Sequence, residues 1–383
     1  MNNWLVMIIV VGLPSYLVRF NIFGIPTTLL EILIYISALF FIISSYRQKI
    51  KINLGLYKIP IVLLILSGLI STYISPDKMQ ALGLFKAYLI DPIIIYLIII
   101  NTKKINKNNI IYCIALSGLL VGMHSFVQYF NHQTSDDGRV LGVFNSSPNY
   151  LALYLAPIVV LGVIQVIKNI KNKILYFWLV VSFFTMFGVY VSGSRAGFIS
   201  VIAGLILFLG FRYYQKKEKM RILLLVLSIL FITISGMIGW KFFGPNFSPE
   251  AKDGRVATSN NLRVMIWQTT FEIIKQKPIF GVGLGNYQNY FTEFTKNRVN
   301  YPEYVSPMAL TPHNIFLTFW VNLGILGLSA FVWILCIFIN ANWQRKNYLL
   351  LSIMLSIVIF GFVDTPYWKN DLALIFWLLI AVT

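Results

Sequence analysis

Apolar stretches of about 20 residues recur along almost the whole chain, a length that matches a bilayer core crossed by a helix. Transmembrane strands need only about half that length, so the pattern favours helices. It predicts an all-α polytopic membrane protein with about twelve transmembrane helices. These spans are expected near residues 3–20, 26–46, 59–75, 81–100, 110–130, 149–167, 174–192, 196–214, 222–240, 313–339, 348–363 and 371–383.

One polar segment, residues 241–312, is far longer than the others and divides the chain. The first nine spans fall within residues 1–240 and the last three within 313–383. Within the long segment, a Thr-Ser-Asn-Asn run at 258–261 precedes apolar residues whose spacing places them on one face of a helix. These are Leu262, Met265, Ile266, Ile273 and Ile274. We expect this capped, amphipathic helix to lie on the membrane surface or over the bundle.

The composition agrees with a membrane protein: 58% of residues are hydrophobic, 11% are charged, and the mean hydropathy is +0.75. Cys113 and Cys336 both lie in apolar runs, where cysteine acts as a small hydrophobic residue. No basic residue precedes Trp4 and no small-residue cleavage site follows, so the first run is interpreted as a retained span.

Basic residues concentrate in alternate short loops. The loops that are rich in basic residues contain Arg47, Lys49, Lys51, Lys58, Lys103, Lys104, Lys107, Lys168, Lys171, Lys173, Arg212, Lys216, Lys217, Lys219, Arg221, Arg345 and Lys346. The loops between them, which are poor in basic residues, contain Lys78, Arg139, Arg195 and Lys369, with Arg19 at a span edge. By the positive-inside rule, we expect the loops rich in basic residues and both termini to be cytoplasmic, and residues 241–312 to be extracytoplasmic. The net charge of +18 therefore reflects topology and lipid headgroups, and does not indicate nucleic-acid binding.

Two arginines on the predicted outer face are candidate functional residues. Arg195 lies in a very short turn between two spans, where an ionisable residue at the membrane boundary is costly; the alternative is snorkelling to headgroups. Arg263 is expected in the first turn of the amphipathic helix, where the helix dipole disfavours a cation unless an anion binds nearby. A solvated surface arginine is the alternative.

His313 is expected at the start of the tenth span, with Thr311 as a capping residue and Pro312 in the first turn. The positive end of the helix dipole favours neutral imidazole there, which is a usable proton acceptor. The alternative is a histidine that only bonds to the neighbouring loop.

Closely spaced glycines occur at residues 281–287, GVGLGNY. Without a βαβ context they are weak support for a dinucleotide site, and indicate a tight reversal or a close approach of the backbone to a ligand. In the fourth span, Lys86 and Asp91 could line a polar pathway; the alternatives are an internal charge pair or a kink linked to Pro92.

Together these features resemble the superfamily of bacterial O-antigen ligases and polymerases. The resemblance rests on residues 138–149 (GRVLGVFNSSPN), 194–197 (SRAG), Arg263 with Trp267, residues 281–287 and 312–314 (PHN), with Leu323-Gly324 beyond, and covers roughly residues 139–370. The first five spans match only in hydropathy.

The resemblance implies a multi-pass protein of the bacterial cytoplasmic membrane that transfers a glycan from a polyprenyl pyrophosphate to a hydroxyl of a lipid core or a growing polysaccharide. It implies Arg195, Arg263 and His313 as catalytic residues, and Arg139, Asn314, Asp364, Gly283 and Gly285 as substrate-binding candidates. Ligases and polymerases share these motifs, so the resemblance does not separate them.

The residues suit that chemistry without a cofactor. Arginines can stabilise a leaving pyrophosphate and a neutral histidine can accept the proton of the acceptor hydroxyl. No Asp-x-Asp pair for a divalent metal occurs in the sequence, and attack opposite the leaving group predicts inversion. The alternative from another class is a transporter or flippase for an amphiphilic anion, although the sequence shows no internal repeat.

Overall fold

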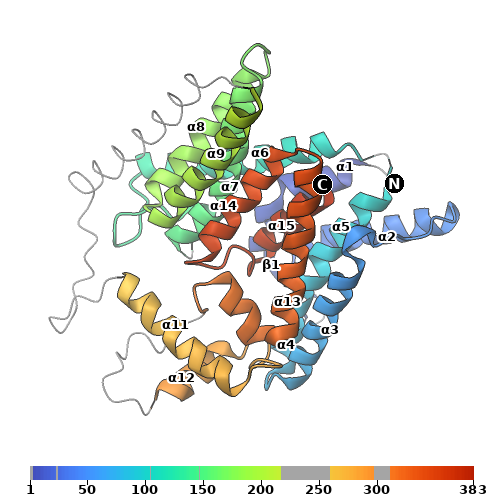
Figure 1. Ribbon diagram of the computed structural model, residues 1–383, viewed down its shortest axis with the longest axis vertical. Coiled ribbons are helices and arrows are strands. Elements are labelled where there is room, and N and C mark those ends of the chain that lie inside the picture. The colour runs from blue at the N-terminus through green and yellow to red at the C-terminus, as the bar shows by residue number, and fades with distance from the viewer. Residues whose placement is uncertain (1–2, 23–24, 104, 146, 217–258, 297–310) are drawn as a thin grey trace.

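The computed structural model describes residues 3–22, 25–103, 105–145, 147–216, 259–296 and 311–383. The predicted span 222–240 lies outside the described residues. The described part is a bundle of helices, with two helices of the long loop, α11 and α12, beneath it in the view of Figure 1. The helices are α1 (Asn3–Val11), α2 (Leu29–Arg47), α3 (Lys58–Ile74), α4 (Lys78–Phe85), α5 (Asp91–Asn101), α6 (Lys107–Phe130), α7 (Pro148–Lys168), α8 (Leu175–Val191), α9 (Arg195–Lys216), α11 (Ser259–Gln276), α12 (Tyr287–Thr295), α13 (Ile315–Gln344), α14 (Tyr348–Gly361) and α15 (Asn370–Ala381).

The polytopic α-helical class is confirmed. Seven described helical stretches are long and apolar enough to cross a membrane, fewer than the predicted number. They are Leu29–Arg47, Gly55–Ile74, Lys78–Asn101, Lys107–Phe130, Pro148–Lys168, Arg195–Tyr213 and Ile315–Gln344. The apolar helices α8, α14 and α15 are shorter.

The prediction of one continuous helix over residues 3–20 is wrong. Helix α1 ends at Val11, a 3₁₀ turn follows over Leu13–Leu17, and strands β1 (Arg19–Ile22) and β2 (Ile25–Thr28) form an antiparallel hairpin. Gly12 is a poor helix former and Pro14 has no N–H to donate, so the α-helix cannot continue. The chain therefore enters α2 from a hairpin, with Thr28 and Glu31 forming a capping box.

The helices pack in two groups around the buried α7 and α15. Helices α6, α8, α9 and α14 pack around α7, whereas α3 packs on α13 and α5 on α15 (Figure 1). Trp178 and Trp377 are among the largest fully buried side chains of this core.

Several loops that were predicted to be cytoplasmic meet at one end of the bundle. The Nζ of Lys107, at the start of α6, lies 2.6 Å from the carbonyl oxygen of Thr383, and the Nδ2 of Asn342, near the end of α13, lies 3.1 Å from its hydroxyl. Tyr96 on α5 donates to the carbonyl of Leu54 in the α2–α3 loop at 3.0 Å. We call this the basic end of the bundle.

Helix α13 is broken at Gly324, where φ is +70° and ψ is −173°. The segment 278–282, which follows α11, occupies the break. Val282 N–H donates to the carbonyl of Val321 at 2.7 Å, and Ile325 N–H donates to the carbonyls of Pro278 and Ile279 at 3.2 Å each. A loop backbone thus replaces the hydrogen bonds that the helix lacks at this point.

The glycines at 281–285 allow this docking. A Cβ on Gly281 would lie 2.3 Å from the carbonyl oxygen of Val321, and one on Gly283 would lie 2.9 Å from the Cα of Ser75 at the end of α3. The hydroxyl of Ser75 donates to the carbonyl of Leu284 at 2.8 Å. The close approach made by these glycines is therefore to the protein's own backbone.

We expect Gly324→Ala to destabilise the protein by more than about 1–3 kcal/mol, the usual cost of a strained backbone conformation. The added Cβ would also lie 1.9 Å from the carbonyl oxygen of Ile279 and push segment 278–282 out of the break. Thermal unfolding in detergent would measure the loss. Gly210→Ala in α9 is the matched control, because its Cβ meets nothing within 4 Å; an equal melting temperature for both variants would contradict this role for Gly324.

Candidate functional site

The candidate site lies at the end of the bundle opposite the basic end, where α7 and α13 begin. Asn314 is the residue that caps α13: its side-chain oxygen accepts from the N–H groups of Phe316 and Leu317 at 3.0 and 3.1 Å. Its Nδ2 donates to the carbonyl of Phe362 at 3.0 Å. The prediction that Thr311 caps this helix is wrong. Both polar groups of Asn314 are used within the protein, and its role as a substrate contact stays a prediction.

His313 precedes the cap and lies outside the helix. Its φ of +48° is a left-handed conformation that few residues other than glycine adopt. Trp267 on α11 donates from its indole N–H to the carbonyl of His313 at 3.4 Å, which ties the long-loop helix to this residue. The imidazole Nδ1 lies 3.5 Å from Oδ1 of Asp364, longer than an ordinary hydrogen bond.

Asp364 follows α14 and its side chain is almost fully buried. Burial raises the pKa of the carboxyl, but the contact with His313, the hydrogen bond from the N–H of Thr365 at 2.8 Å and the charge of Arg263 outweigh burial, so the net pKa lies below its ordinary value. Asp364 is therefore an ionised carboxylate against His313. The bond from Asn314 to Phe362 holds together the two segments that carry this pair.

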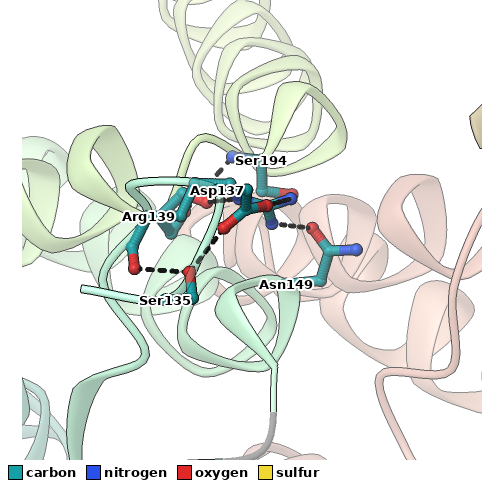
Figure 2. Close-up of polar contacts among 6 residues, drawn as sticks. Ser135, Asp137, Arg139, Asn149 and Ser194 are labelled. Atoms are coloured by element: carbon teal, nitrogen blue, oxygen red, sulfur yellow. Dashed lines mark hydrogen bonds and ion pairs between the residues drawn. The ribbon is translucent and has the colours of Figure 1, made fainter. Parts of the chain in front are cut away.

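Arg139 is anchored where the loop after α6 meets the α8–α9 turn (Figure 2). Its Nε donates to the carbonyl of Ser192 at 2.8 Å, and its Nη2 donates to Oδ1 of Asn149 at 2.9 Å. Asp137 lies 3.5 Å from Nη1. Burial lowers the pKa of the guanidinium and the nearby Arg263 lowers it further, while Asp137 opposes both.

Arg263 brings a second guanidinium to the site from α11. Helix α11 begins at Ser259, so Arg263 lies one turn further along the helix than predicted, where the dipole acts less strongly. Its charge acts on both Arg139 and Asp364. The structure therefore gathers Arg139, Arg263, His313 and Asp364 from separate parts of the chain.

Arg195 opens α9, three residues after the Ser192 carbonyl that Arg139 holds. Its side chain is exposed. The neighbouring Ser194 is buried, and its hydroxyl accepts from the N–H of Gly197 at 3.3 Å. Arg195 therefore has an exposed side chain and directly follows the turn that Arg139 holds through the Ser192 carbonyl. Its catalytic role stays a prediction.

The two glycines proposed to contact substrate pack against α3 and α4. Gly283 lies against Ser75, and a Cβ on Gly285 would lie 3.1 Å from the side-chain carbon of Gln80. The structure gives both glycines a packing role. A substrate contact at either position stays a prediction.

A buried network that the sequence analysis missed lies beside Arg139. The hydroxyls of Tyr16 and Tyr150 are 2.5 Å apart, and Tyr150 donates to the carboxylate of the fully buried Asp371. Tyr150 follows Asn149, which holds Arg139, and Nζ of Lys369 lies 5.2 Å from the centre of the Tyr150 ring. The network joins the start of α7 to the start of α15, and no local pattern indicates it because its members are far apart in the sequence.

Lys86 is the first residue of a π-helical turn (Lys86–Ile90) and Asp91 follows the turn, and the two side chains do not pair with each other. Lys86 lies 3.1 Å from Glu31 and Asp91 accepts from the hydroxyl of Tyr35 at 2.8 Å, both partners on α2. The predicted internal charge pair is therefore replaced by two contacts between helices.

Among the described residues, no cluster of three or more His, Cys, Asp or Glu side chains could hold a metal ion.

Residues 178–332 match the family model of the O-antigen ligases. This part of the chain is therefore similar to the O-antigen ligases. The matched region contains Arg195, Arg263 and His313, while Arg139 and Asp364 lie outside it and are joined to it only in the folded structure.

Curated proteins from three bacteria are similar to this chain. An O-antigen ligase of Salmonella typhimurium is 24% identical over 80% of this chain and 75% of its own length. An uncharacterized protein of Haemophilus influenzae is 23% identical over 62% of this chain, and a putative polysaccharide ligase of Rickettsia conorii is 23% identical over 66%. The alignments span 61% and 62% of the length of these two relatives.

We expect Asp364→Asn to lower the stability of the protein by about 1–3 kcal/mol at neutral pH, because His313 and Arg263 lose an ionised partner. Because folding lowers the pKa of Asp364, its contribution is complete above about pH 4 and is lost as the pH falls through the folded pKa. The melting temperatures of wild type and variant should therefore differ at neutral pH and converge in acid.

Melting curves in detergent across this pH range measure the effect. Asp137→Asn is the control, because Asp137 is largely exposed beside Arg139 and its loss should change little. Equal melting temperatures of wild type and Asp364→Asn at neutral pH would contradict the proposed stabilisation.

Proposed function

We propose that this protein is a membrane glycosyltransferase that moves a glycan from a polyprenyl pyrophosphate to an acceptor hydroxyl. The observation that carries the proposal is the gathering of Arg139 and Arg263 with the His313–Asp364 pair at one end of the bundle. The family match and the ligase names of two relatives support glycan transfer. In this proposal the acceptor hydroxyl belongs either to a lipid core sugar, as in a ligase, or to a growing polysaccharide, as in a polymerase.

The arginines provide the leaving-group half of the reaction. Arg139 and Arg263 repel each other, and a pyrophosphate between them would relieve that repulsion while accepting charge-assisted hydrogen bonds. Negative charge grows on the pyrophosphate as the glycosidic bond breaks, so fixed cations stabilise the transition state more than the ground state. Arg195, displayed from the adjoining turn, is proposed as a third cation for the same group.

His313 and Asp364 provide the acceptor half. A carboxylate beside Nδ1 favours the tautomer that carries the proton there, which leaves Nε2 free to accept the proton of the attacking hydroxyl. Hydrogen bonds of this kind are often long without substrate and shorten when it binds, in keeping with the 3.5 Å contact. Attack on the face opposite the pyrophosphate inverts the configuration of the anomeric carbon.

The charge pattern supports an extracytoplasmic site. Under the positive-inside rule the basic end is cytoplasmic, and the four site residues lie at the other end. A transporter or flippase is the alternative function. It has less support, because Lys86 and Asp91, its best polar pathway, are both engaged by α2.

The first test separates the two halves of the proposed reaction by measuring donor binding and glycan transfer on purified protein. His313→Asn, which tolerates the left-handed backbone, should reduce turnover by about 10²–10⁴-fold while donor affinity changes little. Arg263→Lys should weaken both donor binding and turnover, because an ammonium group cannot reproduce the planar guanidinium. Arg212→Lys, at the far end of α9, is the matched control and should match wild type.

Loss of donor binding in His313→Asn without a further loss of turnover would make this residue a ligand contact and move the base elsewhere. Full activity in an Arg195→Ala or Arg263→Ala variant would remove that arginine from the mechanism. Donor movement across vesicles with no transfer to any acceptor would favour the flippase alternative.

The second test concerns metal independence, which we propose because the sequence lacks an Asp-x-Asp pair and supplies arginines instead. Transfer by the purified protein should continue unchanged in excess chelator. A loss that magnesium or manganese restores would contradict charge stabilisation by arginines alone.

A further inference from the structure

The turn that fills the break in α13 exposes large apolar side chains to the outside of the protein. Ile279 and Phe280 are 59% and 52% exposed, and Ile325, directly after the break, is 42% exposed. Side chains of this size cost free energy in water, and a contiguous exposed group of them marks a contact surface. We define Pro278, Ile279 and Phe280 as the apolar tip.

The length of α13 after its break indicates where the apolar tip lies relative to the membrane boundary. The part of this helix after Gly324 runs from Ile325 to Gln344, about 30 Å at 1.5 Å per residue, which equals the thickness of the hydrocarbon core. Arg345 and Lys346 follow Gln344 and mark one membrane boundary, so Ile325 lies near the other. Because Ile325 N–H donates to the carbonyls of Pro278 and Ile279, the apolar tip lies at that same boundary.

The residues around the apolar tip suit a lipid interface. Lys275 and Lys277 are exposed at the end of α11, directly before the tip, and can reach lipid phosphates while the tip enters the acyl chains. The indole N–H of Trp320 donates to the carbonyl of Pro278 at 3.0 Å, an amphipathic ring of the kind found at membrane boundaries. Pro278 has no N–H to bury, and the carbonyls of Pro278 and Ile279 both accept hydrogen bonds, which lowers the cost of inserting these groups.

We propose that the apolar tip inserts into the outer acyl region of the adjacent phospholipid leaflet and anchors the α11–α12 unit to the bilayer. The surface is continuous with the lipid-facing side of α13, which argues for lipid as its partner rather than another protein. Since α11 carries Arg263 and Trp267, the anchor also fixes the height of this part of the candidate site above the membrane.

Depth-dependent quenching tests the anchor without reference to glycan transfer. The full chain, with Cys113 and Cys336 replaced, carries a single cysteine from Phe280→Cys, is labelled with a small fluorophore and is reconstituted into phosphatidylcholine–phosphatidylglycerol vesicles. Lipids brominated near the headgroup should quench this probe strongly, lipids brominated deep in the chain should quench it less, and aqueous iodide should have little effect.

Two further positions bracket the result. Glu293→Cys, on the exposed polar side of α12, should respond to iodide and not to brominated lipids. The natural Cys336, exposed on the spanning part of α13, should respond to deep bromines. A Phe280 probe that follows the Glu293 pattern would overturn the proposal, and so would one shielded from both lipid and iodide, because another protein segment would then cover the tip.

Discussion

A broken helix in a membrane must find partners for the backbone groups that it no longer pairs, and this requirement organises the half of the molecule that carries the candidate site. At Gly324 the partners come from segment 278–282, through Val282 and Ile325. The same segment connects α11 to α12 and rests on α3 through Ser75. Hydrogen-bond satisfaction at one glycine therefore determines where the segment between α11 and α12 is held.

The site shows how main-chain contacts can join segments that are distant in sequence. Arg139 holds the Ser192 carbonyl, Trp267 bonds to the carbonyl of His313, and Asn314 bonds to that of Phe362. Each contact fixes a loop rather than a side chain. The charged groups of the site are therefore brought together by contacts that hold the main chain.

The sequence predicted the helical membrane class and the position of most spans, because apolar length alone determines them. It failed over residues 3–20, where hydropathy continues through a segment that Gly12 and Pro14 divide into a helix, a turn and a strand. It also misplaced the cap of α13, since Thr311 and Asn314 are both acceptable capping residues and only the loop geometry chooses between them. The contact between His313 and Asp364 depends on the packing of α14 against α13, which no local pattern encodes.

The network of Tyr16, Tyr150 and Asp371 has a consequence for how the protein is assembled in the membrane. Tyr16 is 134 positions from Tyr150, which is 221 positions from Asp371. Tyr16 is synthesised before Tyr150, and its hydroxyl meets this buried partner only after α7 is inserted. The carboxylate that completes the chain of hydrogen bonds arrives with α15. Tyr16 therefore reaches its final hydrogen-bonded position only after helices that are translated much later are in place.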